Sequence, residues 1–148
     1  MQLKASAALV ALVLLAPLPA GACSLNLSTG GTLGLSADGR RLSSNEGGLP
    51  ATFTIADLSL LGSTISISAP QLVEHGAGFN AGSAVLESSY TASWLLGSSS
   101  SVYSSSTKSF DAPGVLNLVV TMTLNNRIVS DAGFPSGTYT TRTIVTCS

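Results

Sequence analysis

Two cysteines and one histidine are the residues of this sequence whose types and placement could do chemistry. Cys23 and Cys147 stand near opposite ends of a chain of 148 residues. If the chain is exported, such a pair predicts a disulfide, because disulfides form and persist outside the reducing cytosol. The alternative is a lipidated Cys23 at the start of the mature chain, which would leave Cys147 as an odd thiol. We favour the disulfide.

The first 22 residues predict export. MQLK carries one charge, Lys4, and an apolar run follows from Ala5 to Leu15. Ala20-Gly21-Ala22 then supplies the small residues of a signal-peptidase site. Lipoprotein signals usually have Leu where this chain has Ala20, which is a further reason to prefer the disulfide. The apolar run falls short of the roughly 20 residues that span a bilayer, so we expect a signal peptide over 1–22 and no transmembrane segment in the mature chain.

His75 does not predict a catalytic site. It is the only histidine, and it follows Glu74 in QLVEHGAGF without an HExxH or CxxC pattern. Serines are abundant and four aspartates could complete a triad, but no GxSxG motif marks a nucleophile. The acidic residues are spread singly, without a paired-carboxylate or calcium-loop pattern. We therefore expect no catalysis, no metal and no cofactor, with His75 in a turn or on the surface.

The charge balance excludes one class of partner. Removing Lys4 with the leader leaves five basic and seven acidic residues, a net charge of −2. Nucleic-acid binding proteins carry a basic patch that attracts phosphates. We expect no nucleic-acid partner.

The elements that must position these residues are predicted to be strands. In LNLVVTMTL, one face is apolar and the other carries Asn117, Thr121 and Thr123. This alternation is typical of a half-buried strand. The residues of the predicted buried face are Leu116, Leu118, Val120, Met122 and Leu124. Shorter alternations occur at Leu25 and Leu27, Leu33 and Leu35, Phe53 and Ile55, Ile65 and Ile67, and Tyr139 to Cys147.

Turn residues separate these runs. Asp38-Gly39 and the stretch 45–48 suit tight turns, and the stretch 111–114 marks another boundary between strands. Asn125-Asn126 and the stretch 131–137 are predicted to separate the last two strands. About seven short strands over residues 23–148 favour a single immunoglobulin-like antiparallel β-sandwich. Antiparallel pairing of the first and last strands would then bring Cys23 beside Cys147.

A serine-rich segment, residues 97–109, follows the only tryptophan, Trp94. It predicts either an edge segment that joins two strands or an exposed recognition loop. In the second interpretation Tyr90, Trp94 and Tyr103 form a binding patch for a glycan or peptide. Core packing explains the same rings equally well.

The closing stretch SGTYTTRTIVTCS, with its Gly137-Thr138-Tyr139 turn into an alternating strand, resembles secreted pilus-like subunits, particularly the spore-coat-U type of bacterial surface protein. The resemblance covers the last dozen residues and the Ser/Thr/Gly-rich composition. It implies an immunoglobulin-like fold and assembly with other surface or fibre subunits.

Such subunits complete a neighbour's sandwich with a free N-terminal arm. The alternation from Leu25 to Leu35 suits that role, but a Cys23–Cys147 bond would hold the arm on its own domain. We expect an exported, non-catalytic structural or adhesive protein of the periplasm, the cell surface or the extracellular space. The alternative is a periplasmic or surface binding module, as a lipoprotein if Cys23 is lipidated.

Overall fold

The structure is a computed structural model that describes residues 23–56, 58–114 and 119–148. Their regular elements are β-strands and one 3₁₀ turn, η1 (Ala81–Ser83), which confirms the predicted all-β class. The predicted signal peptide, Leu116 and Leu118 lie outside the described residues. The strands are β1 (Ser24–Thr29), β2 (Gly34–Leu35), β3 (Arg41–Ser43), β4 (Ala51–Ala56), β5 (Ser63–Ile67), β6 (Gln71–Glu74), β7 (Val85–Trp94), β8 (Gly97–Ser104), β9 (Lys108–Ala112), β10 (Val119–Val129), β11 (Thr140–Arg142) and β12 (Val145–Cys147).

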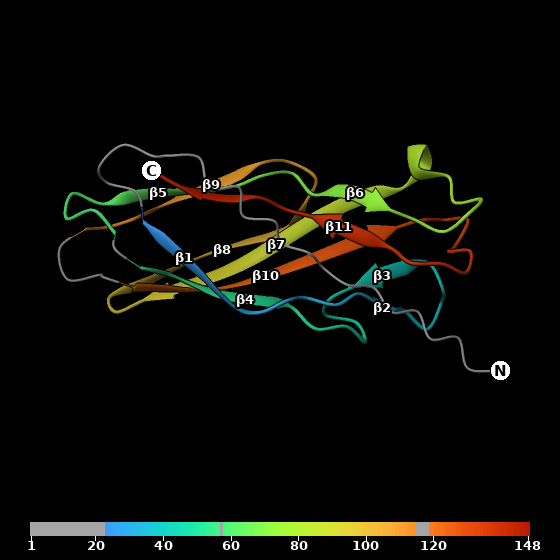
Figure 1. Ribbon diagram of the computed structural model, residues 1–148, viewed down its shortest axis with the longest axis horizontal. Helices are drawn as coiled ribbons and strands as arrows, with labels where there is room; N and C mark the ends of the chain where they lie inside the picture. The colour runs from blue at the N-terminus through green and yellow to red at the C-terminus, as the bar shows by residue number, and fades with distance from the viewer. Residues whose placement is uncertain (1–22, 57, 115–118) are drawn as a thin grey trace.

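The larger sheet is organised around β10, its longest strand (Figure 1). β4 and then β3 pair along one edge of β10, and β7 pairs along the other. β1 lies outside β4, β2 outside β3 and β8 outside β7. Every pair is antiparallel, so the order β1-β4-β10-β7-β8 alternates in direction throughout.

The second layer contains the sheets β12-β5-β9 and β11-β6, which lie opposite the larger sheet in Figure 1. Two hydrogen bonds join them where β5 passes into β6 and β11 into β12. The Ser68 N–H donates to the Ile144 carbonyl (2.8 Å), and the Ile144 N–H donates to Ser68 Oγ (2.9 Å). The result is a sandwich-like arrangement of two facing layers.

Burial along β10 confirms the predicted strand register. Val120 and Met122 are fully buried and Leu124 is 5% exposed, whereas Thr121 on the opposite face is exposed. These side chains pack against both layers, because apolar residues of the second layer belong to the same cluster. That cluster contains Ala51, Phe53, Ile55, Leu58, Ile65, Ile67, Tyr90, Ala92, Phe110, Ala112, Val120, Met122, Leu124 and Cys147. A second cluster contains Leu33, Leu42, Phe79, Ile128 and Tyr139.

The prediction of a chain break at Asn125-Asn126 is wrong. Both residues lie inside β10, and Asn126 is 2% exposed between the two apolar clusters. Asparagine often marks a turn because it tolerates positive φ. Here its amide finds partners across the sandwich in Thr141 and Thr143, so the strand continues. The predicted break over residues 131–137 is confirmed between β10 and β11.

The first and last strands do not pair with each other, contrary to the prediction. β1 pairs with β4 in the larger sheet, and β12 pairs with β5 in the second layer. The predicted common face of Leu33 and Leu35 is also wrong, since Leu33 is 6% and Leu35 is 49% exposed. Leu33 precedes β2, which contains only Gly34 and Leu35, so the two leucines do not belong to one regular strand.

Candidate functional site

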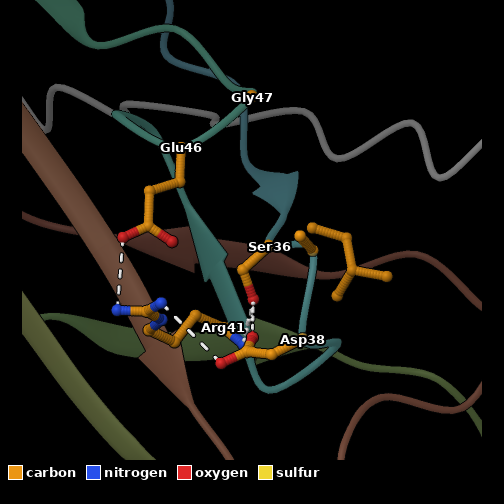
Figure 2. A pocket seen from close by; sticks show the side chains of 7 residues that line it. Ser36, Asp38, Arg41, Glu46 and Gly47 are labelled. Carbon is orange, nitrogen blue, oxygen red and sulfur yellow. Dashed lines mark hydrogen bonds and ion pairs between the residues drawn. The ribbon is translucent and has the colours of Figure 1, made fainter.

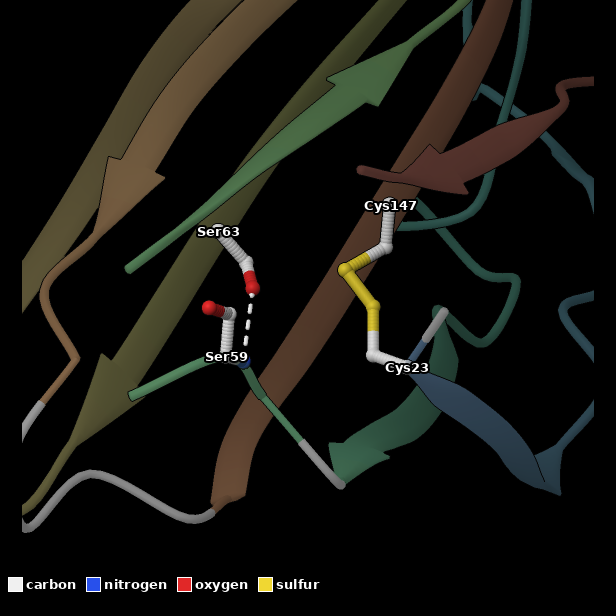
Figure 3. Close-up of a disulfide and its surroundings, with 4 residues drawn as sticks. All are labelled: Cys23, Ser59, Ser63 and Cys147. Atoms are coloured by element: carbon white, nitrogen blue, oxygen red, sulfur yellow. Dashed lines mark hydrogen bonds between the residues drawn. A yellow bond between two sulfur atoms is a disulfide. The ribbon is translucent and has the colours of Figure 1, made fainter. Parts of the chain in front are cut away.

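Cys23 and Cys147 form a disulfide that joins the two layers (Figure 3). Their Cα atoms are 6.1 Å apart, within the range that disulfides require. Cys147 is buried in the main cluster, and Cys23 packs against that cluster just before β1. The bond occupies the sulfur that lipidation would need. Beside it, the Ser59 N–H donates to Ser63 Oγ (3.0 Å) at the start of β5.

A charged depression lies beside the β2–β3 turn (Figure 2). It has a volume of about 480 Å³. Arg41 lies 3.7 Å from the Asp38 carboxylate and 3.3 Å from that of Glu46. Ser36 Oγ donates to Asp38 (2.5 Å), and the Arg40 N–H donates to the same oxygen (3.1 Å). These bonds, the Ser36 bond first, hold the pKa of Asp38 below its usual 3.8.

The polar side chains that line this depression bind one another and cap the β2–β3 turn. Its one arginine is already matched by two carboxylates, and each of these side chains is more than a third exposed. Exposed ion pairs of this kind contribute little to stability, because solvent screens them. The Ser36-x-Asp38-Gly39 spacing is the sequence signal for the turn, and Gly39 adopts a φ of 70° there.

His75 is exposed and lies just after β6. Its Nδ1 is hydrogen-bonded to the Gly76 carbonyl (3.1 Å), and its ring is 5.7 Å from that of Phe79. The neighbouring Glu74 accepts a hydrogen bond from Thr140 (3.1 Å). Among the described residues, no group of three His, Cys, Asp or Glu side chains gathers where it could hold a metal ion.

The three aromatic residues of the predicted binding patch do not share one surface. Tyr90 is 4% exposed, stacks on Phe110 inside the sandwich and is hydrogen-bonded to Ser99 (3.0 Å). Trp94 is half-buried and lies parallel to the same Phe110 ring, 6.0 Å away. The structure therefore brings Tyr90 and Trp94 together through Phe110, on the inner side of β7.

Tyr103 belongs to the outer face of the larger sheet. Its ring lies 4.1 Å from the Arg127 guanidinium. Arg127 lies on the face of β10 opposite to that of the buried residues Val120, Met122 and Leu124. Arg127 Nε also donates to Glu87 (2.6 Å). The serine-rich residues between Trp94 and Tyr103 form β8, an edge strand, as the first interpretation of that segment predicted.

A buried polar bridge crosses the sandwich between the two apolar clusters. Asn126 Nδ2 donates to Thr141 and Thr143 of the opposite layer (both 3.1 Å). Beside it in the register, Ser88 accepts a hydrogen bond from Lys108 Nζ (2.8 Å). Burial lowers the pKa of Lys108, and the negative charge of Glu87 opposes that shift. No local pattern in the sequence predicts this bridge, because its residues lie in two different layers of the fold.

Comparison of the chain with protein-family models, curated proteins and solved structures finds no match. In the described part of the chain, no helix has the length and apolar character needed to cross a membrane. The structural feature that unites both layers and both ends of the described domain is the Cys23–Cys147 bond.

Proposed function

We propose that this protein is an exported, non-catalytic structural or adhesive component of the bacterial cell surface, built on an immunoglobulin-like sandwich. The observation that carries the proposal is the disulfide between Cys23 and Cys147, which are separated by 124 positions. Such a bond suits an oxidising compartment. It agrees with the signal-peptide pattern of residues 1–22.

The position of this bond suits a protein that carries mechanical load. The described domain lies almost entirely inside the covalent loop that the bond closes. Tension applied to the chain on either side would pass through the disulfide, without unzipping the hydrogen bonds between strands. A subunit of a surface fibre or coat would benefit from this arrangement.

Local features also support the immunoglobulin-like assignment. Tyr139 lies just before β11, and its hydroxyl donates to the Pro135 carbonyl four residues upstream (2.8 Å). Immunoglobulin-like domains use a comparable tyrosine corner. The position of the disulfide differs, since theirs bridges two central strands and this one ties the first strand to the last.

The N-terminal arm has a defined place in this proposal. β1 already pairs with β4 of its own domain, and Leu25 packs against the main cluster. The proposal therefore does not require this arm to complete a neighbouring subunit. Other contacts would have to join the copies.

The test is to express the full chain in a bacterium and to locate it by cell fractionation. The exported protein is then purified and examined by light scattering and electron microscopy. We expect it outside the cytoplasm as ordered fibres or large particles. A protein retained in the cytoplasm, or an exported one that stays an inert monomer, would contradict the structural role.

A binding module for a glycan or peptide is the second candidate. Exposed apolar residues at the β7–β8 turn favour it, because Leu95 and Leu96 are 75% and 73% exposed beside Trp94. Trp94 is the only tryptophan, so its fluorescence reports on this site alone. A saturable change in that fluorescence with added oligosaccharides or peptides would favour the binding module.

A further inference from the structure

β8 is an open edge of the larger sheet. It pairs with β7, and no other described strand pairs with it. Its sequence, GSSSSVYS, contains no charged residue and no proline. Unpaired N–H and C=O groups along such an edge are a template for another strand.

Charged side chains stand on two of the other edge strands. β9 has Lys108 and Asp111, and β11 has Arg142. β1, at the far side of the larger sheet, is uncharged like β8 but shorter, with six residues. Charges on an edge strand oppose pairing with a further strand. β8 is the longest of these edge strands, with eight residues.

Two further observations show that β8 has an exposed apolar side chain and hydroxyl groups without hydrogen-bond partners. Val102 is 84% exposed. The hydroxyls of Ser101 and Tyr103 are buried without a hydrogen-bond partner, and the third such atom in the described chain, Arg142 Nε, also lies on an edge strand. Buried polar groups in folded proteins normally have partners. Hydrogen bonding is thus least complete at the edges.

We propose that β8 is a self-association edge, and that two copies of this protein pair through antiparallel β8 strands. Strand direction favours β8 of the second copy, and not its β1, as the strand that pairs with β8. Directions alternate along β1-β4-β10-β7-β8, so β1 and β8 run the same way. Simple translation of a copy would therefore set β8 beside β1 in parallel, whereas a two-fold axis sets β8 against β8 in the antiparallel pattern of the whole sheet.

The two-fold pairing also defines a register. Residues directly opposite each other in an antiparallel ladder point to the same face of the sheet. A two-fold axis between two β8 strands must therefore place one residue directly opposite the same residue of the second copy. Ser100 lies near the middle of β8 and is exposed on the outer face, opposite Thr91 of β7. Pairing centred there sets Ser100 against Ser100 and Ser99 against Ser101, the last residue of β8 before the irregularity in its pairing with β7. No like charges meet, and the dimer closes on itself.

This pairing is a property of the folded domain and does not depend on the role proposed above. It is tested with the full chain, purified with its disulfide intact, by sedimentation over a range of concentrations. Ser100→Lys sets two like charges against each other across the axis. We expect the dimer to dissociate about tenfold more readily or worse in this variant, because like charges directly opposite repel.

The matched control is Asn26→Lys, which adds the same charge to an exposed position on β1, the opposite edge of the same sheet. We expect this variant to dimerise like the unmodified protein. Hydrogen exchange provides the second readout: amides of residues 97–104 should gain protection as concentration rises, whereas those of β1 should not.

Three results would overturn the proposal. The first is a protein that stays monomeric at the highest concentration reached, with no added protection in β8. The second is a dimer that Ser100→Lys and Asn26→Lys weaken equally. The third is concentration-dependent protection of β1 in place of β8, which would indicate a different contact between copies.

Discussion

At the scale of single residues, Asn126 is a buried polar side chain whose hydrogen-bond partners lie in the opposite layer. It is 2% exposed on the inward row of β10, between Leu124 and Ile128. It donates to Thr141 and Thr143 and also accepts a hydrogen bond from Thr143 (3.2 Å). The three side chains form a closed group, so losing one member leaves the others unsatisfied.

Replacing Asn126 by Leu should lower the free energy of unfolding by about 1–3 kcal/mol, the cost of leaving buried hydroxyls unpaired. Urea unfolding measures this change. A triple variant, in which Thr141 and Thr143 are also replaced by Val, should recover most of the loss because no polar group is then orphaned. If the triple variant is as unstable as Asn126→Leu, the hydrogen bonds are not the source of the effect.

Asp38 should make stability depend on pH in a defined direction. Its pKa in the folded protein is lowered, chiefly by the Ser36 hydrogen bond, so its contribution is present above the usual 3.8 and is lost as pH falls through the folded pKa. Asp38→Asn should therefore be less stable than the unmodified protein near neutral pH. The two stability curves should converge in acid, as measured by thermal unfolding. A constant gap across pH would show that the charge is not involved.

At the scale of elements, the alternation along β10 decides which substitutions the fold tolerates. Val120 is fully buried between the layers, whereas Thr121 lies exposed on the outer face beside Thr54 and Ser93. β7 alternates in the same sense, with Tyr90 and Ala92 buried and Thr91 exposed. The larger sheet therefore has an apolar face toward the second layer and a polar outer face, and the alternation along β10 defines both.

Replacing Val120 by Asp should abolish cooperative folding, because an unpaired carboxylate would enter the apolar cluster. Replacing the adjacent Thr121 by Asp adds the same charge to the solvent face and should change stability by about 0.5 kcal/mol or less. Near-ultraviolet circular dichroism and urea unfolding report the difference. The reverse ranking would mean that the strand register is wrong.

At the scale of the whole molecule, the disulfide sets how the domain responds to force. The two layers are held together by their shared apolar clusters and by one covalent bond between the two ends of the described domain. With that bond intact, Cys23 and Cys147 cannot move apart by more than the length of the disulfide linkage. With the bond broken, the whole loop becomes available for extension.

We therefore expect the oxidised domain, held by handles fused to its two ends, to show no unfolding extension in single-molecule force spectroscopy. Adding a reductant should release about 400 Å of chain, since 124 residue steps extend by roughly 3.3–3.6 Å each. Cys147→Ser should give the same extension without reductant. An oxidised domain that extends by this length would mean that the bond does not form.

Local periodicity was enough to predict several features from the sequence. The two-residue alternation at Val120, Met122 and Leu124 predicted an all-β protein and the correct buried face, because side chains of a strand point to opposite sides in turn. Two cysteines at distant positions predicted one disulfide, which the structure contains. The turn at Asp38-Gly39 followed from residues that tolerate positive φ.

Contacts between distant strands were decided only by the tertiary structure. Asn126 was mistaken for a turn residue because its partners, Thr141 and Thr143, come from another layer. Tyr90 and Tyr103 lie on the two sides of one sheet, although both belong to the same hairpin. The Cys23–Cys147 bond links two layers and not two paired strands. Alternation determines which face of a strand is apolar, but the choice of neighbouring strand depends on how all the faces are buried together.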